Sequence, residues 1–370
     1  MAVATARRFV AVEPRGVPTL WVRVASPVVA IIGAGLAGAV LLLATGHDPL
    51  TAYRGIVRAS FGNKFGWMST LISATPLILT AVSAAVAFRM RVWNIGQEGQ
   101  LYLGAIAASG IALALGDHVS AAVALPLLLL AGIVGGAVWA ALAAFPRAYL
   151  RTDEVISTLM LNFIALYLMN YLIFGSVSFW RDKQNIGFPS GRLIPDNAQL
   201  PNIWLRLHVG IVIAIVVAAA LWWWLRSSRW GFDLRVIGDS VSAARYSGMN
   251  VARRTVSVLL VSGAIAGLAG AIQVSGVTQA LQPRSLAVNI GYTGIVVAAV
   301  ARLNCLAILP VAVLIAGLSN AGSSLQILGI PSDIVLLLQG VVLLLVAASE
   351  FFLYNRIRVE WPWRSSSQQA

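Results

Sequence analysis

The chain has 370 residues, of which 59% are hydrophobic and 11% are charged, and its mean hydropathy is +0.84. Soluble domains are about half apolar and about a quarter charged, so this composition excludes an ordinary soluble domain. The formal net charge of +13 would suit a nucleic-acid partner, but Lys and Arg cluster between apolar segments, which indicates membrane topology instead.

Apolar segments long enough to cross a bilayer as helices follow one another along the chain. Residues 1–26 carry arginines without a cleavage site, which predicts a cytoplasmic tail and a retained first span. We expect one all-α polytopic membrane domain of about ten helices over residues 27–353, followed by a cytoplasmic C-terminal tail, 354–370. The expected spans are 27–45, 68–88, 98–115, 121–145, 155–178, 208–225, 255–275, 290–303, 306–324 and 333–353.

The distribution of basic residues predicts the orientation. With the N-terminus inside, 18 of the 26 Lys and Arg residues fall in inner segments, which favours inner N- and C-termini and an even number of spans. Residues 46–66 are expected to form an interfacial helix, and residues 179–207, rich in Pro, Gly and Asn, an extracytoplasmic loop. Residues 226–254 are expected to form a long, basic cytoplasmic segment.

A short string occurs twice and suggests an inverted internal repeat. Asn94-Ile95-Gly96, followed by Gly99, opens the third span, and Asn289-Ile290-Gly291, followed by Gly294, opens the eighth. The expected topology places the first copy on the inner side and the second on the outer side. Transporters use such repeats, with the pathway at the repeat interface.

The cytoplasmic segment is expected to contain a short helix over residues 240–247. Asp239 or Ser240 would cap its N-terminus, and Gly248 would end it in the left-handed conformation. So short a helix outside the membrane needs a docking partner, because alone it would fray.

Two stretches carry a resemblance to a known family. Residues 88–100 contain Asn94-Ile95-Gly96-Gln97-Glu98-Gly99-Gln100, which looks like an N-[IL]-[GA]-x-E-G-Q signature. Residues 231–270 match a second pattern, from which Val236-Ile237-Gly238 departs mildly because the usual alanine two residues before the glycine is missing. The matching residues there are Gly231, Arg235, Ala243, Ala244, Gly248, Met249, Asn250, Ser262, Gly263, Ala266, Gly267 and Gly270. Together the stretches resemble ABC importer permeases for ribose-type sugars and nucleosides, and the first resembles their nucleoside-type branch.

The resemblance covers about residues 65–350 and implies a function and partners. The chain would be the permease subunit of a type II-like ABC importer for a nucleoside or simple sugar, surrounded by lipid in a bacterial inner membrane. It would pair with a paralogous permease, an ATPase subunit with two fused ATP-binding domains, and an extracytoplasmic substrate-binding protein. It lacks a G-x-x-x-x-G-K-[ST] string, so ATP would bind to the ATPase; the chain itself would be no enzyme and need no cofactor.

The resemblance also implies that the short helix is a coupling helix, which closure of the ATPase would push. The alternative is a merely solvated loop. A crosslink between residue 244 and the ATPase would distinguish them. The expected coupling residues are Ser240, Val241, Ser242, Ala243, Ala244, Arg245, Tyr246, Ser247 and Gly248.

A second group of polar residues is predicted to line or gate the pathway. A carboxylate near the membrane is costly unless it faces protein or water, and amides bind hydroxyl-rich ligands. The alternative is structural, with Asn94 and Asn289 as helix caps and Glu98 favourable at a helix N-terminus. Buried groups such as Asn162 and Ser262 either line the pathway or join helices. The candidates are Asn94, Gln97, Glu98, Asn289, Tyr292 and Thr293.

The alternative function is a secondary transporter of a small polar solute. Ion coupling usually needs acidic or histidine residues inside spans, whereas Asp153, Glu154, Asp333 and Glu350 lie near span ends. The three histidines are scattered and Cys305 is the single cysteine, so neither a metal site nor a disulfide is expected. The sequence contains neither H-E-x-x-H nor G-x-S-x-G, which argues against a membrane enzyme.

Overall fold

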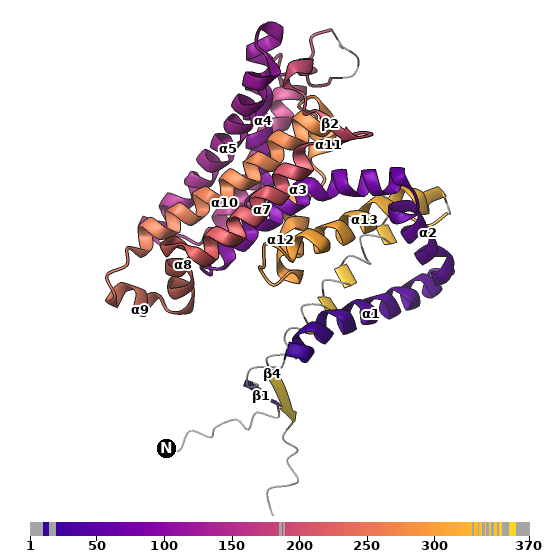
Figure 1. The fold of residues 1–370 in the computed structure, drawn as a ribbon, viewed down its shortest axis with the longest axis vertical. Helices are drawn as coiled ribbons and strands as arrows, with labels where there is room; N and C mark the ends of the chain where they lie inside the picture. Colours follow the sequence, from indigo (N-terminus) through magenta and orange to yellow (C-terminus); the bar gives the residue numbers. More distant parts are fainter. Residues whose placement is uncertain are drawn as a thin grey trace, which may run out of the picture. The chain divides into compact units, whose positions relative to one another are not determined.

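The structure is a computed structural model that describes residues 10–14, 20–184, 187, 189–327, 329–331 and 355–359, with part of the segment 333–349. The described chain is mainly helical (Figure 1). It divides into two compact units, one of residues 1–53 and 328–370, the other of residues 54–327.

The first unit joins the two ends of the chain. It contains α1 (Leu20–Ala44), the start of α2 (Pro49–Phe61), and an antiparallel sheet of β1 (Val10–Pro14) and β4 (Asn355–Val359). The described positions between 333 and 349 are helical. The two cytoplasmic tails, 1–26 and 354–370, stay predictions; β1 lies in the first and β4 in the second, and α1 begins before residue 27.

The second unit is a helical bundle. Irregular turns extend or join its helices: η1 (Gly116–His118), η2 (Pro146–Leu150), η3 (Tyr171–Gly175), η4 (Asp196–Ala198) and η5 (Val274–Thr278). A small hairpin of β2 (Asn202–Trp204) and β3 (Leu207–His208) lies in the loop before α7. The helices are α3 (Lys64–Phe88), α4 (Gln97–Leu115), α5 (Ala121–Phe145), α6 (Glu154–Asn170), α7 (Gly210–Ser227), α8 (Arg229–Asp239), α9 (Val241–Tyr246), α10 (Val251–Gln273), α11 (Pro283–Leu286), α12 (Ile290–Val300) and α13 (Ile308–Ile327).

Among the described residues, seven helical segments are long and apolar enough to cross a membrane. They are Lys64–Phe88, Gln97–His118, Ala121–Leu150, Glu154–Gly175, Gly210–Ser227, Val251–Thr278 and Pro283–Val300. Two apolar helices, Ile32–Ala44 and Ile308–Gly322, are shorter. The prediction of a polytopic helical membrane protein is confirmed, whereas the count of about ten spans and the inverted repeat stay predictions.

Glycines allow α4, α5 and α10 to approach each other closely. A Cβ on Gly267 of α10 would collide with the Gly132 carbonyl of α5, and one on Gly104 of α4 would collide with the Gly267 backbone. Small residues at such positions bring helix backbones together, and dispersion forces then hold helices in lipid. The glycine-rich sequence of α10 therefore builds the centre of the bundle.

Helix α3 forms a second central element. Every residue from Ala74 to Phe88 is buried, because α3 packs against α7, α10, α12 and α13. In the expected interfacial segment, residues 46–66, the structure has the amphipathic helix α2, and the expected loop 179–207 is irregular apart from η4 and short strands. This arrangement places the ends of α3, α5, α8 and α10 around one end of the bundle, beside α9.

Candidate functional site

Helix α8 is held firmly against the bundle. The Trp230 ring stacks on that of Trp224 with centroids 4.6 Å apart, and its Nε1 donates to Ser257 Oγ at 3.1 Å. A Cβ on Gly238 would collide with the Arg89 carbonyl, so the end of α8 meets the end of α3. Helix α8 therefore connects α9 rigidly to the spans.

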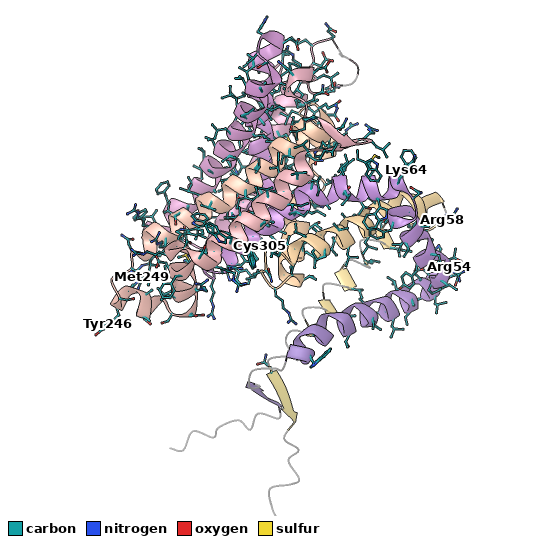
Figure 2. All side chains as sticks on the ribbon, in the orientation of Figure 1. Arg54, Arg58, Lys64, Tyr246, Met249 and Cys305 are labelled. Carbon is teal, nitrogen blue, oxygen red and sulfur yellow. The ribbon has the colours of Figure 1, made fainter. Side chains whose placement is uncertain are left out.

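Helix α9 is the short capped helix that the sequence predicts. The Ser240 Oγ accepts from the Ala243 N–H at 3.2 Å, and Gly248 has a φ of +80°. Ala244 is buried against the protein, whereas Tyr246 is 97% exposed and projects from the tip of the bundle (Figure 2). The exposed candidates are Val241, Ser242, Ala243, Arg245, Tyr246, Ser247 and Gly248, with Ser240 partly buried.

The burial of Ala244 affects how a coupling role must be tested. Its side chain faces the permease and not the surroundings. A crosslink at residue 244, as the sequence suggested, would therefore be the wrong probe, and Tyr246 is the position from which a partner can be reached.

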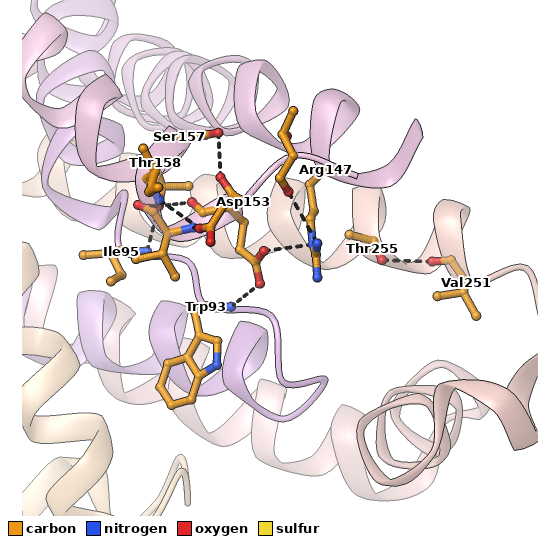
Figure 3. Close-up of polar contacts among 12 residues, drawn as sticks. Trp93, Ile95, Arg147, Asp153, Ser157, Thr158, Val251 and Thr255 are labelled. Carbon is orange, nitrogen blue, oxygen red and sulfur yellow. Dashed lines mark hydrogen bonds and ion pairs between the residues drawn. The ribbon is translucent and has the colours of Figure 1, made fainter. Parts of the chain in front are cut away.

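An ion pair fixes the loop between α3 and α4 beside this end. Glu154 is buried, and its Oε2 lies 2.9 Å from Arg147 Nε. Its Oε1 accepts from the Trp93 N–H at 3.3 Å (Figure 3). Asp153 caps α6 by accepting from the Val155 N–H at 2.8 Å. The acidic pair that the sequence places near a span end therefore has structural partners.

A buried carboxylate lies at the junction of α4 and α12. Glu98 is 2% exposed and accepts from Tyr102 Oη and from the Gly291 N–H, each at 2.5 Å. Because the N-terminal N–H groups of a helix lack intrahelical acceptors, Glu98 of α4 serves as the cap of α12.

Asn94 anchors a network among α3, α4 and α10. Its Nδ2 donates to Gln100 Oε1 at 3.1 Å and to Ser262 Oγ at 2.9 Å. Its Oδ1 accepts from the Gly96 N–H at 2.9 Å. Ser262 Oγ lies 2.9 Å from Ser83 Oγ, so the network is closed among buried partners.

Asn162 joins α6 to α4 and α12. Its Oδ1 accepts from the Gly99 N–H at 2.8 Å, and its Nδ2 donates to the Ile95 carbonyl at 2.8 Å and to Tyr292 Oη at 3.0 Å. A buried amide in a span must find such partners. The structure therefore gives Asn162 and Ser262 the helix-joining contacts that were one of the two readings for them.

Gln97 is the exception in this cluster. Its side chain is fully buried, yet neither its Nε2 nor its Oε1 has a partner among the described residues. The Nε1 of Trp139, near Gly99, is likewise without a partner there. Buried polar atoms normally hydrogen bond, so the Gln97 amide offers a donor and an acceptor to a small polar molecule.

The two repeated strings meet in space. A Cβ on Gly291 would collide with the Glu98 backbone, so the second string packs directly on the residues that follow the first. Asn94, Gln97 and Glu98 are buried inside the chain, Asn289 is exposed, and Tyr292 and Thr293 are partly exposed. The candidates on the first string are thus enclosed in a polar cluster, and those on the second string form the partly exposed edge of that cluster.

The two asparagines considered as helix caps occupy different positions in the structure. Gly96, not Asn94, is the N-cap of α4, because α4 begins at Gln97. Asn289 is the N-cap of α12, but it adopts a left-handed φ of 59° and its side chain makes no cap hydrogen bond. The two strings therefore differ in local structure, since only the second contains an N-cap asparagine.

Sequence reasoning missed several members of the cluster. Tyr102, Gln100 and Ser83 were not singled out, although all three bond to candidates. The spacing of Tyr102 four residues after Glu98 is a helix-neighbour signal that could have identified it. Ser83 had no such signal, because its partner lies on α10.

The described residues contain no group of three His, Cys, Asp or Glu side chains placed to hold a metal ion. Cys305 is a buried free thiol. The described unit contains a short capped helix with an exposed face, α9, and an enclosed polar cluster whose edge is partly exposed.

Comparison with known proteins gives a consistent result. A family model described as the branched-chain amino acid transport system permease component matches residues 66–347. The guanosine ABC transporter permease protein NupP of Bacillus subtilis is 32% identical over 324 residues, 87% of this chain and 92% of its own length. The glucose ABC transporter permease protein TsgB13 of Haloferax volcanii is 30% identical over 368 residues, 97% of this chain and 96% of its own.

Relatives also come in pairs within one organism. The nucleoside ABC transporter permease protein NupB of Lactococcus lactis is 30% identical over 336 residues, 88% of this chain and 91% of its own. The same organism has NupC, another nucleoside ABC transporter permease protein, and Bacillus subtilis has NupQ besides NupP. NupC and NupQ each match 56% of this chain, at 28% and 29% identity.

Proposed function

Because the chain belongs to the family of branched-chain amino acid transport system permease components, and is a membrane permease subunit of an ABC importer, we propose that it translocates a nucleoside or a simple sugar. The observation that carries the proposal is the similarity, over 87% to 97% of the chain, to permeases named for guanosine, glucose and nucleosides. Transport components of this kind work beside an ATPase and are not themselves enzymes.

Uptake measurements test the substrate. In cells deleted for the gene, uptake of labelled guanosine, adenosine, glucose and ribose is compared with uptake after complementation by the wild-type chain. We expect one nucleoside or sugar to be restored, and unlabelled members of its class to compete. Restored uptake of a branched-chain amino acid, with none of the four sugars or nucleosides, would contradict the proposal.

The importer assembles from this chain, a paralogous second permease, an ATPase with two ATP-binding domains and an extracytoplasmic binding protein. The paired relatives NupP with NupQ and NupB with NupC support the heterodimer. Affinity purification of the chain from its own membranes is expected to recover both the second permease and the ATPase.

Helix α9, with its caps at Ser240 and Gly248, is the coupling helix in this proposal. The ATPase binds its exposed face. When the ATPase closes, the displacement of α9 is transmitted to the spans through the buried Ala244 and through α8, which is packed against the bundle. A rigid connection is what force transmission requires, because a frayed loop would absorb the displacement.

The partly exposed edge of the cluster lines or gates the pathway; its residues are Asn289, Tyr292 and Thr293. Glu98 positions this edge through its hydrogen bond to the Gly291 N–H. Tyr292 supplies an aromatic face suited to a base or a sugar ring, and Asn162 orients its hydroxyl. Asn94 belongs to the supporting network, and Gln97 is placed where a bound water or hydroxyl could be accommodated.

The chain lies in the bacterial inner membrane with both termini in the cytoplasm. The basic-residue bias supports this orientation. Pairing of β1 with β4 supports it further, because both strands must lie on one side of the membrane to form a sheet. Termini on the same side require an even number of spans.

A further inference from the structure

A basic cavity of about 750 Å³ lies at the α9 end of the bundle, and the exposed α9 residues Val241 and Arg245 form part of its lining. It is enclosed by the loop after α3, the turn η2 after α5, the α8–α9 corner and the start of α10. Four arginines line it: Arg91, Arg147, Arg151 and Arg245. The last of these is an exposed residue of α9.

The arginines are not neutralised within the described part of the chain. Arg147 pairs with Glu154, but Arg91, Arg151 and Arg245 have no ion-pair partner there. Asp239 is the one carboxylate among the lining residues. Like charges around one partly enclosed space repel each other, so the cavity is electrostatically suited to an anion.

The backbone holds two of these arginines in an uncommon conformation. Arg91 has a φ of 56° and Arg151 a φ of 60°, in the left-handed region that non-glycine residues rarely adopt. The Arg151 N–H donates to the Pro146 carbonyl, and the Arg91 N–H donates to the Phe88 carbonyl at 2.9 Å. Such conformations persist where the surrounding structure imposes them, and they gather at binding sites.

Apolar side chains lie beside the arginines on the same turn. Phe145 is 51% exposed, Tyr149, which lines the cavity, is 65% exposed, and Leu150 is 74% exposed. The turn η2 forms the last residues of the candidate membrane span Ala121–Leu150. A ligand that combined an anionic group with an apolar body would satisfy both sets of side chains.

We propose that this cavity binds the phosphate headgroup of an anionic phospholipid, with the acyl chains lying along Phe145 and Leu150. Arginine suits the phosphate because its planar guanidinium can donate two parallel hydrogen bonds. Basic pockets between spans at the membrane surface are sites of this kind. A free anion would make no contact with the exposed apolar side chains beside the cavity, whereas the acyl chains of a lipid would cover them.

The test measures lipid retention by the purified full-length chain. Native mass spectrometry compares binding of dioleoylphosphatidylglycerol with that of the zwitterionic dioleoylphosphatidylcholine. We expect the wild type to prefer the phosphatidylglycerol, and Arg91→Gln and Arg151→Gln each to weaken that binding about fivefold. Arg91→Lys, which keeps the charge, should retain most of the affinity and shows that a loss in Arg91→Gln is not misfolding.

Arg229→Gln is the matched control, because Arg229 is exposed at the start of α8 and does not line the cavity. If Arg229→Gln weakened phosphatidylglycerol binding as much as the cavity variants do, general surface charge would explain the binding and the proposal would be overturned. Displacement of the lipid by inorganic phosphate or glycerol phosphate at matched concentration would also overturn it, because it would identify a free-anion site. If Arg91→Gln and Arg151→Gln bound lipid normally but released the ATPase, the cavity would belong to the ATPase interface and the proposal would be wrong.

Discussion

Glu98 shows how one side chain can connect segments distant in the chain. Its carboxylate accepts from the Tyr102 hydroxyl and from the N–H of Gly291, at the start of α12 and 193 residues away. A carboxylate at a helix N-terminus is favourable because it faces unpaired N–H groups and the positive end of the helix dipole. Its contribution is therefore to position α12.

Replacement of Glu98 by alanine should lower both stability and transport. Each buried donor left without an acceptor costs about 1–3 kcal/mol, so the midpoint of thermal unfolding should fall by several degrees. Glu98→Gln keeps one acceptor oxygen, so its midpoint of thermal unfolding should fall less than that of Glu98→Ala. Thermal unfolding of the purified chain and ATP-driven uptake by the assembled importer provide the two measurements.

Tyr102→Phe is the control, because it removes one donor and leaves the α12 cap intact. We expect it to cost about 1–3 kcal/mol, because Glu98 Oε1 loses its hydroxyl donor, and less than Glu98→Ala, which leaves two buried donors without an acceptor. If Glu98→Ala unfolded at the wild-type temperature but abolished uptake, Glu98 would contact the substrate directly and the capping interpretation would be wrong.

His208 is a buried titratable group outside the spans. Its Nδ1 accepts from the Gly210 N–H at 3.1 Å, and its Nε2 has no partner among the described residues. The ring is wedged against Gly276, where any Cβ would come within 2.7 Å of it. Burial lowers the pKa of His208 from 6.5 to about 4.

The lowered pKa of His208 predicts an acid-sensitive fold. Between the unfolded pKa of 6.5 and the folded pKa of about 4, the unfolded chain binds more protons than the native chain. Stability is therefore intact above 6.5 and falls as the pH drops toward 4, by up to about 3 kcal/mol. Thermal unfolding of His208→Gln measured across this range should show a flatter pH dependence than the wild type.

His118→Gln is the matched comparison, because His118 is exposed and its replacement removes no buried ring. It should keep the wild-type pH dependence. An unchanged slope in His208→Gln would mean that other groups cause the acid sensitivity.

Helix α9 is an element too short to be stable alone, and its environment decides which face is useful. Ala244 anchors it, whereas Tyr246 is exposed to a partner. This orientation distinguishes two neighbouring positions that the sequence pattern treats alike.

Cysteine at position 246 should crosslink to the ATPase, and cysteine at position 244 should not. Tyr246→Ala is expected to lower uptake by about fivefold or more, since exposed aromatic residues are frequent interface anchors. Crosslinking in membranes containing the whole importer, and uptake normalised to ATP hydrolysis, measure the two effects. Efficient crosslinking at 244 with none at 246 would reverse the assigned face of α9.

For the whole molecule, the topology can be tested directly. Pairing of β1 with β4 requires both termini to lie on one side. A fluorescent reporter that folds only in the cytoplasm should be active at either terminus and within residues 226–254. An alkaline phosphatase fusion within residues 179–207 should be active instead. Phosphatase activity at the C-terminus, together with a cytoplasmic N-terminus, would exclude an even number of spans.

The sequence predicted local features well because their causes are local. Hydropathy over about 20 residues identifies a span, and the Ser240 and Gly248 caps delimit α9 within one residue of the expected helix. The signature around Asn94 and Glu98 was also recognised. What the sequence could not indicate was that Glu98 caps α12 and not its own helix, because that depends on how two distant helices pack.

The sequence by itself therefore determined the class of protein, the approximate spans and the family, since composition, periodicity and motifs are properties of the chain. Only the tertiary structure decided which polar groups satisfy one another, which face of α9 is exposed, that β1 pairs with β4, and that four arginines surround one cavity. The physical reason is that a buried polar or charged group must find its partner in space. In a helical bundle that partner comes from whichever helix packs alongside, at a sequence separation that no local pattern encodes.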